Sequence, residues 1–374
     1  MTKQLISLGL MSGTSGDGVD ASIIQSDGEA EYKTIYDNYF EYSQEIYEQI
    51  HELKEKINNS EQISLFKNEI DDLEKKITLF HAKVVSSAIK ESKQIIDLVG
   101  FHGQTIFHNA KEKISKQLGD PRLLFQLVNK KIVYNFRQND LANGGEGAPL
   151  SPIFHKLITE KNKINLPLCI LNIGGISNVT LINKFDFNEL VSRDIGPGNC
   201  LIDEWVRKNS KNKFDKEGML AKMGTCNEVI LEQAQELFLN RPDKEALSLD
   251  TKDFDVSFAR GLSLEDGAAT LTEFTSNIIA DALNTLFEKS NNNFWKILLC
   301  GGGRKNKSLI NLIKNKINKK NTIDLIDNFK INGDYVESQA FAYIAIRSYL
   351  KLPISFPKTT GCKKPCSGGL VIEN

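Results

Sequence analysis

Five polar, glycine-rich segments, each placed directly after a short apolar run, are the feature that most restricts what this chain can fold into. They are residues 11–20, 101–108, 135–140, 172–178 together with 194–199, and 300–306. One such segment says little, because glycine turns end most β-strands. Five in one chain, with hydroxyl and charged side chains among the glycines, indicate a site for a large anionic ligand.

The apolar runs between these segments predict an α/β protein with mixed sheets flanked by helices. The first half is expected to contain strands at 4–10, 19–25, 32–39, 98–101 and 132–136, a helical stretch at 44–96 broken at 58–60, and a helix opened by Asp120-Pro121. The second half begins in the same way, with expected strands at 168–173, 179–182, 190–195, 296–300 and 322–326 and a helix at 201–208. The glycine-rich residues 143–147 between the halves suggest a hinge.

Length and charge narrow the possible classes of function. A chain of 374 residues exceeds the usual size of one domain, so two domains that share a cleft are expected. The net charge of −1 leaves no basic excess that would favour nucleic acid or an anionic membrane as partner. The sequence has no apolar stretch of the ~20 residues that cross a bilayer, and its start does not resemble a signal peptide, so a cytoplasmic location is expected.

The cysteines favour free thiols over a metal site. Several of the six lie in apolar runs, where a buried thiol is the ordinary outcome. Cys362 and Cys366 are four residues apart and could begin a zinc site, but no second pair and no nearby histidine completes four ligands. We therefore do not expect bound zinc.

The first glycine-rich segment has the composition of a phosphate loop. Glycines let backbone N–H groups approach phosphate oxygens, hydroxyls add donors, and Asp17 could hold Mg²⁺ through water. It is not a Walker loop, because no Gly-Lys-Ser/Thr follows, and a plain hairpin turn remains the alternative. The candidate residues are Gly13, Thr14, Ser15, Gly16, Asp17, Gly18, Val19 and Asp20.

Three single side chains are candidates for other roles. Asp194 is expected to end a strand just before a Gly-Pro-Gly turn, where a carboxylate could act as a general base or simply accept N–H groups of its own turn. Arg137 could clamp a carboxylate or phosphate, or form a surface pair with an aspartate. His102, at an expected strand end, suits hydrogen bonding to a polar ligand, whereas His108 is as readily a structural histidine.

The two remaining glycine segments complete the pattern. Residues 172–178 are similar to a second phosphate turn. The three glycines at 301–303 leave room for a flat ring against the backbone, although taken alone this segment could be any strand-to-helix loop.

Taken together, these segments resemble the anhydro-N-acetylmuramic acid kinases, a branch of the sugar kinase, Hsp70 and actin superfamily, and they follow the family's order over nearly the whole chain. The resemblance implies a two-domain, actin-like ATPase (ribonuclease H-like) fold with the active site, ATP and Mg²⁺ in the interdomain cleft. The implied lobes are residues 1–140, completed by the C-terminal 338–374, and residues 141–337. The implied reaction opens the 1,6-anhydro bond of 1,6-anhydro-N-acetylmuramic acid with water and transfers the γ-phosphate to O6, giving N-acetylmuramic acid 6-phosphate.

The resemblance also implies residue roles. Asp194 would activate the attacking water, and Asp17 would lie at the Mg²⁺ of the ATP phosphate loop. The other nucleotide segments would be Gly174, Gly175, Gly301, Gly302 and Gly303. Sugar binding would fall to His102, Thr105, Arg137 and Glu337, the last of which could instead be a solvated acid in a first helical turn. One departure concerns Gly16, where the family usually has leucine.

Two alternatives stay open at this point. A kinase of the same fold could act on another hexose or amino sugar, and a non-catalytic sugar sensor could share the fold. Members of the family that this chain resembles often form homodimers, so the resemblance also implies a homodimer as one oligomeric state.

Overall fold

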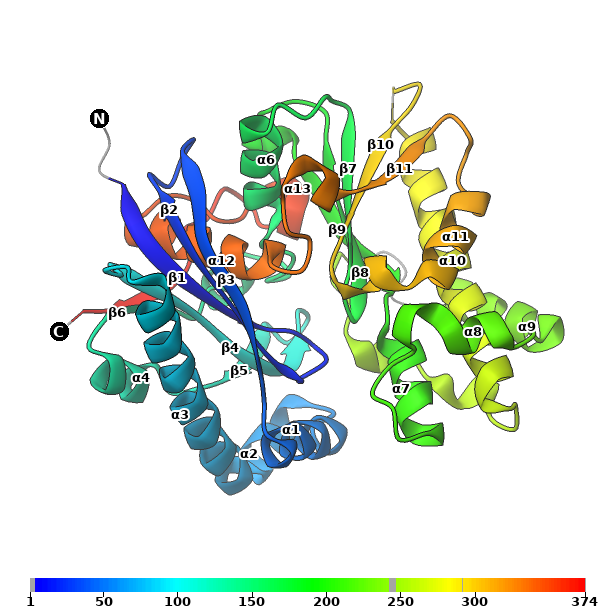
Figure 1. Ribbon diagram of the computed structural model, residues 1–374, viewed down its shortest axis with the longest axis horizontal. Coiled ribbons are helices and arrows are strands. Elements are labelled where there is room, and N and C mark those ends of the chain that lie inside the picture. Colours follow the sequence, from blue (N-terminus) through cyan, green and yellow to red (C-terminus); the bar gives the residue numbers. More distant parts are fainter. Residues whose placement is uncertain (1–3, 242–246, 291, 374) are drawn as a thin grey trace. The chain divides into compact units, whose positions relative to one another are not determined.

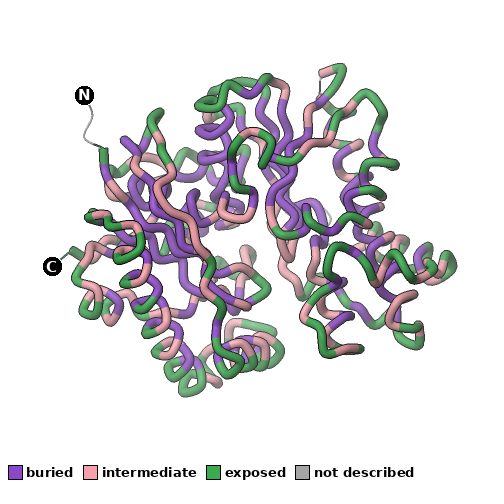
Figure 2. Tube along the Cα trace, viewed as in Figure 1, coloured by how far each residue is buried: buried purple, intermediate pink, exposed green. Residues whose placement is uncertain are grey.

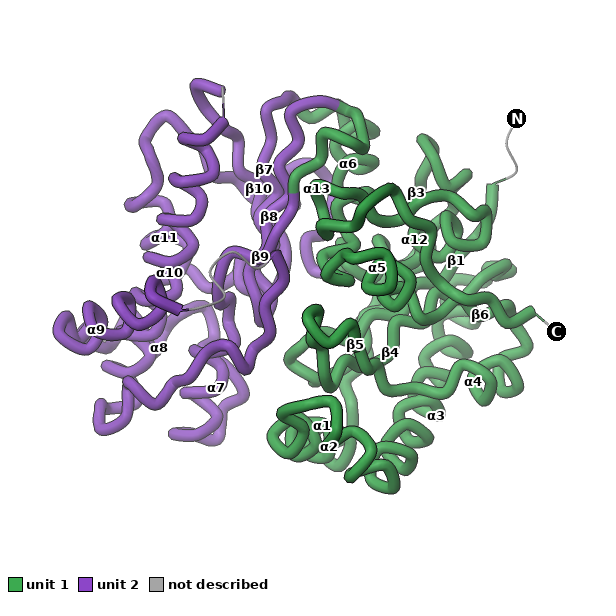
Figure 3. The backbone as a smooth tube through the Cα atoms, turned by 180° about the vertical axis from the view of Figure 1, so that it is seen from behind, with its two compact units in different colours: residues 1–164, 185–191, 335–374 green, residues 165–184, 192–334 purple. Residues whose placement is uncertain are grey.

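The computed structural model describes residues 4–241, 247–290 and 292–373. These residues form two compact units (Figure 3). Unit 1 comprises Met1–Ile164, Phe185–Val191 and Tyr335–Asn374, and unit 2 comprises Asn165–Lys184 and Ser192–Asp334. The lobes predicted from the sequence differ from these units chiefly at residues 141–164, which belong to unit 1. The assignment of the two predicted lobes as separate domains stays a prediction.

Unit 1 is built on a seven-stranded mixed sheet in the order β12-β6-β4-β1-β2-β3, with β5 paired to β4 (Figure 1). Strand β1 is antiparallel to β2 and parallel to β4, and β4 is parallel to β6. The strands are β1 (Leu5–Ser12), β2 (Gly18–Ser26), β3 (Tyr32–Glu41), β4 (Leu98–Asn109), β5 (Ile114–Leu118), β6 (Lys131–Tyr134) and β12 (Leu370–Ile372).

Unit 2 is built on a five-stranded sheet that repeats this arrangement. Its order is β11-β10-β7-β8-β9, in which β7 is antiparallel to β8 and parallel to β10. The strands are β7 (Leu168–Ile173), β8 (Ile176–Ile182), β9 (Val191–Pro197), β10 (Lys296–Cys300) and β11 (Thr322–Leu325). In each sheet the first three strands of the unit are neighbours in sequence order. Two later strands extend the sheet beyond the first strand and run parallel to it. This repeated order is that of the actin-like ATPase fold, which confirms the predicted fold class.

The helices lie against these sheets. Those of unit 1 are α1 (Gln44–Lys56), α2 (Ser60–Leu65), α3 (Lys67–Ser92), α4 (Pro121–Val128), α5 (Gln138–Ala142), α6 (Pro152–Lys161), α12 (Val336–Tyr349) and α13 (Pro357–Thr360), with the 3₁₀ turn η1 (Phe187–Glu189). Those of unit 2 are α7 (Cys200–Asn209), α8 (Met219–Met223), α9 (Glu228–Leu239), α10 (Leu264–Glu288) and α11 (Lys307–Lys316), with the turns η2 (Lys216–Gly218), η3 (Thr251–Asp253), η4 (Val256–Ala259), η5 (Gly302–Lys305) and η6 (Ile326–Phe329). Within the described residues, no helix has both the length and the apolar character needed to span a membrane.

Local signals account for several of these elements. As the sequence predicts, Asp120 caps α4 by accepting from the backbone N–H groups of Arg122 and Leu123, and a proline opens the helix. Two of the predicted strand ends bear on the candidate site, and both were wrong. Strand β4 continues beyond Phe101 to Asn109 because β5, which the sequence analysis missed, pairs with it. Strand β9 likewise runs on to Pro197, so Asp194 lies within the strand and not at its end.

Two glycines let α12 pack directly on the sheet of unit 1, in which strands β1, β2 and β4 are mostly buried (Figure 2). A Cβ atom on Gly9 of β1 would lie 2.1 Å from the carbonyl oxygen of Ser338, and one on Gly100 of β4 would lie 2.6 Å from that of Phe341. Both obstacles are backbone atoms of α12, which cannot rotate away. Glycine is therefore required at both positions by close packing.

We expect Gly9→Ala to destabilise the protein strongly. The added methyl group must push α12 off the sheet, and overpacking of this kind costs about 1–3 kcal/mol or more. A thermal melt followed by circular dichroism should show a clear drop in Tm. Gly302→Ala is the matched control, because a Cβ there meets no atom within 4 Å. An unchanged Tm for Gly9→Ala would contradict the close packing.

Candidate functional site

In unit 1 the predicted phosphate loop joins β1 to β2, and its backbone is held by side chains. Gln104 donates to the carbonyl oxygen of Gly13 at 2.9 Å, and Lys54 donates to that of Thr14 at 2.6 Å. His51 Nε2 lies 3.0 Å from the carbonyl oxygen of Ser15. Three successive carbonyls are thus engaged, and the N–H of Gly16 also donates to the carbonyl oxygen of Gly13 at 3.2 Å, so the shape of the loop is fixed from within and from outside.

Two details of this loop concern the predicted roles of Asp17 and Gly16. The hydroxyl of Ser15 donates to Asp17 at 2.6 Å, so the predicted Mg²⁺ residue is oriented from within the loop. Gly16 has φ +63°, and a Cβ there would lie 2.9 Å from Ile50 Cγ2, so this loop conformation favours glycine over leucine. The predicted nucleotide residues Gly18, Val19 and Asp20 lie in β2, where their backbone pairs with β3.

Gln104 is a site residue that the sequence analysis missed. It is fully buried in β4, directly beside Ser12 of β1 in the parallel register. Its amide group joins β4 to the loop through the hydrogen bond to Gly13. The available signal was its place in the polar run after an apolar strand, two residues after His102.

His102 and Arg137, both predicted to bind sugar, contact each other. Arg137 Nη2 lies 2.9 Å from His102 Nε2, and His102 Nδ1 lies 2.7 Å from the carbonyl oxygen of Gly103. A guanidinium only donates and a carbonyl only accepts, so Nδ1 carries the proton and Nε2 is the acceptor. Burial, reinforced by the charge of Arg137, holds the pKa of His102 well below its ordinary value. His102 is therefore neutral and orients Arg137.

Arg137 is also held by the segment that follows it. Its Nη1 donates to the carbonyl oxygen of Gly147 at 2.8 Å, and the N–H of Gly147 donates to Asp140 Oδ2 at 2.7 Å. Asp140 is 1% exposed and also accepts from the hydroxyls of Ser355 and Thr360. Residues 143–147, predicted as a hinge, thus lie anchored inside unit 1, and the chain passes between the units after residues 164, 184, 191 and 334.

The other two predicted sugar residues also belong to unit 1. Thr105 lies on β4 and its hydroxyl accepts from Gln117 Nε2 at 3.1 Å. Glu337 lies in the first turn of α12, where the helix dipole favours an acid, so its alternative as a first-turn acid stays open.

Cys362 and Cys366 are buried free thiols beside Asp140. One donor atom of each of these three residues lies within 4.8 Å of the others. Asp140 already accepts three hydrogen bonds, and a structural zinc site needs four ligands. Among the described residues the cluster supplies only three, so they do not complete a zinc site.

In unit 2 the predicted glycine turns meet at one edge of the sheet. The N–H groups of Gly198 and Asn199 donate to the carbonyl oxygens of Gly175 and Gly174, both at 2.8 Å. Strands β7 and β10 are parallel neighbours, with Cys300 opposite Asn172, so the turns after them leave the sheet side by side. The carboxyl ends of parallel strands are where ligand sites collect in such sheets.

Asp194 is 8% exposed and its carboxylate is oriented from a distant part of the chain. The N–H of Leu249 donates to its Oδ2 at 2.8 Å, and its own N–H donates to the carbonyl oxygen of Leu247 at 2.7 Å. The carboxylate thus accepts from a backbone group outside its own turn. A buried, oriented carboxylate of this kind suits a general base.

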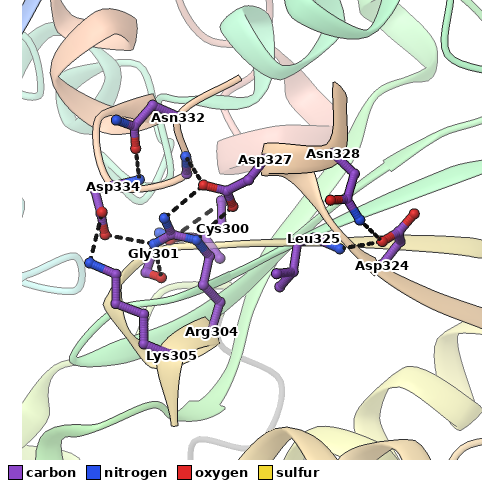
Figure 4. Close-up of polar contacts among 12 residues, drawn as sticks. Cys300, Gly301, Arg304, Lys305, Asp324, Leu325, Asp327, Asn328, Asn332 and Asp334 are labelled. Atoms are coloured by element: carbon purple, nitrogen blue, oxygen red, sulfur yellow. Dashed lines mark hydrogen bonds and ion pairs between the residues drawn. The ribbon is translucent and has the colours of Figure 1, made fainter. Parts of the chain in front are cut away.

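The loop of residues 301–303 lies against the end of β7. A Cβ on Gly303 would lie 2.2 Å from Ile173 Cγ2, whereas Gly302 has open space on that side. Gly301 adopts φ +78°, a conformation that glycine accommodates without strain. Below the loop, Arg304 and Lys305 pair with Asp327 and Asp334 (Figure 4).

Comparison with known proteins identifies the family. Residues 5–374 match the sequence profile of the family described as anhydro-N-acetylmuramic acid kinase. A Pelagibacter ubique protein of that name is 52% identical over 374 residues and the full length of both chains. One from Zymomonas mobilis is 36% identical over 98% of this chain and 99% of its own. Among solved structures, component A of the (R)-2-hydroxyglutaryl-CoA dehydratase of Acidaminococcus fermentans is similar over 93% of this chain and 100% of its own. The TM-score is 0.46 and the sequence identity is 10%, so this similarity does not bear on function. The chain therefore belongs to the anhydro-N-acetylmuramic acid kinase family.

Proposed function

We propose that this protein is an ATP-dependent kinase that opens 1,6-anhydro-N-acetylmuramic acid and phosphorylates its O6, in the recycling of peptidoglycan. The observation that carries the proposal is the family match over residues 5–374. The glycine turns at strand ends and the buried Asp194 are consistent with it. The reaction would take place in the cytoplasm, where ATP is available, and the protein could act as a homodimer.

In this proposal Asp194 takes a proton from water as the water oxygen bonds to the anomeric carbon. The bond between that carbon and O6 breaks, and O6 attacks the γ-phosphorus of ATP while the bond to the β-phosphate oxygen breaks, giving N-acetylmuramic acid 6-phosphate and ADP. Asp194 is held for this role by Leu249. Proton abstraction by a positioned base contributes typically about 10²–10⁴-fold in rate.

Phosphoryl transfer depends chiefly on positioning and on charge neutralisation. The loops of residues 13–17, 174–175 and 301–303 would bind the nucleotide through N–H groups other than those of Gly16, Gly174 and Gly301, which already donate to carbonyl oxygens of the protein. A carboxylate oxygen such as that of Asp17 is a suitable ligand for Mg²⁺, directly or through water, and the ion would neutralise phosphate charge. Arg137, oriented by His102, would bind the carboxylate of the sugar acid.

The test is an assay with purified protein, ATP, Mg²⁺ and the anhydro sugar, analysed by mass spectrometry. We expect a product that has gained both the elements of water and one phosphate. Parallel reactions with N-acetylmuramic acid, N-acetylglucosamine and glucose test the alternative kinases. Gain of phosphate alone would remove the hydrolytic step, and no phosphorylated product from the anhydro sugar would overturn the proposal.

A further inference from the structure

Arg304 follows the three glycines of residues 301–303 and is held from several sides. Its Nε and Nη2 donate to the two carboxylate oxygens of Asp327 at 2.8 and 3.0 Å, and its Nη1 donates to Asp334 at 2.6 Å (Figure 4). The same Nη1 donates to the carbonyl oxygen of Gly301 at 3.0 Å. The side chain is only 6% exposed. Its planar fork is therefore used almost completely inside the protein.

The charge of Arg304 is also balanced locally. Lys305 pairs with Asp334 at 2.7 Å, so two cations face two carboxylates. Burial alone would raise the pKa of Asp327 and of Asp334, but hydrogen bonds from Arg304 outweigh it and lower both. Both aspartates thus remain ionised at neutral pH. A balanced cluster offers little net positive charge to a phosphate.

The cluster acts on the backbone of the glycine loop. Besides the bond from Arg304 to its carbonyl, Gly301 donates its N–H to the carbonyl oxygen of Gly333 at 2.9 Å. Gly333 in turn donates to Asp327 Oδ1 at 3.3 Å. The N–H of Gly301 is thus bonded to Gly333 directly, and its carbonyl oxygen is linked to Asp327 and Asp334 through Arg304. Gly302 keeps open space beside it.

We propose that Arg304 is a positioning residue for nucleotide binding: it fixes the glycine loop 301–303 in the shape that receives the nucleotide, and it does not bind phosphate itself. This inference rests on the proposed function, which assigns the loop to the nucleotide. Lysine cannot replace the bidentate bond to Asp327 together with the bonds to Asp334 and Gly301, because it is a single point charge.

Arg304→Lys tests this role. Lys305→Met is the matched control, since the side chain of Lys305 is 61% exposed and pairs with the same Asp334. Hydrogen bonds to charged groups contribute enough that their loss changes an equilibrium by about tenfold or more. We expect Arg304→Lys to raise KM for ATP by about tenfold or more and to leave KM for the anhydro sugar within about twofold. Lys305→Met should leave both KM values within about twofold.

Nucleotide series distinguish positioning from direct phosphate contact. Dissociation constants for AMP, ADP and ATP, measured by calorimetry, should rise by the same factor in Arg304→Lys if the loop as a whole is displaced. A loss that grows with each added phosphate would mean that Arg304 contacts phosphate and would overturn the inference. If Arg304→Lys does not fold by circular dichroism, Asp327→Asn, which keeps the bond to Asp334, takes its place with the same expectations.

The remaining outcomes separate this inference from the proposed function. A wild-type protein without turnover of the anhydro sugar would sink the proposed function, whereas the nucleotide dissociation constants would still test Arg304. An active wild type whose Arg304→Lys variant matches Lys305→Met in KM for ATP would overturn the positioning role alone.

Discussion

Asp194→Asn is expected to lower the turnover of 1,6-anhydro-N-acetylmuramic acid by about 10²–10⁴-fold and to leave nucleotide binding unchanged. The amide cannot take a proton from water, yet its oxygen can still accept the N–H of Leu249, which lies 2.8 Å from Oδ2 in the wild type. The fold around β9 should therefore persist. Both ring opening and phosphorylation should fail together, because O6 becomes free only when the anhydro bond opens.

Three quantities are measured for each variant: kcat with the anhydro sugar, the dissociation constant for ADP, and Tm. Asp27→Asn is a matched control. Asp27 is also 8% exposed and accepts backbone N–H groups from Glu29, Ala30 and Glu31, but it lies at the far end of β2 from the loop of residues 13–17. Its variant should lose stability and keep kcat. Near-normal turnover by Asp194→Asn would show that another group activates the water.

Acidification below about pH 6.5 is expected to destabilise the folded protein steeply, because three histidines are buried in neutral form. Burial lowers the pKa of His81 from 6.5 to about 4 and that of His155 to about 3. Burial, with Arg137 as a second cause, also lowers the pKa of His102. As pH falls through 6.5, the unfolded chain binds protons that the folded chain does not. The free energy of unfolding must then decrease, by about 1.4 kcal/mol per pH unit for each histidine and about 4 kcal/mol for three.

Proton uptake on unfolding measures this effect directly. At pH 5, unfolding in guanidinium chloride should take up about 2.5 more protons through these histidines than at pH 7.5. His155→Gln should remove about one of them, because the wild-type His155 is buried with a pKa of about 3. Equal proton uptake at the two pH values would contradict neutral burial. The contribution of His81 to this pH dependence ends near pH 4, because His81 then binds a proton in the folded protein as well.

Some of the site could be read from residue order alone, and some could not. Glycine turns after apolar runs predicted the loops at 13–17, 174–175 and 301–303, since a strand must end where its backbone turns. The pairing of Asp194 with Leu249, and of Gln104 with Gly13, could not be predicted, because each joins residues that lie far apart in the sequence. For the same reason the contacts of His102 with Arg137 and with the carbonyl oxygen of Gly103 could not be predicted, and the role of His102 in sugar binding stays a prediction.

The pattern of apolar and polar residues determined most strands, the cap of α4 by Asp120 and the α/β class of the fold, because burial periodicity and backbone conformation are local properties of the chain. The repeated strand order of the two sheets, the continuation of β4 along β5 and the clustering of Arg304 with Asp327 and Asp334 were decided only by the tertiary structure. These features depend on pairs of residues brought together by folding. A hydrogen bond between distant residues leaves no mark in the sequence around either one.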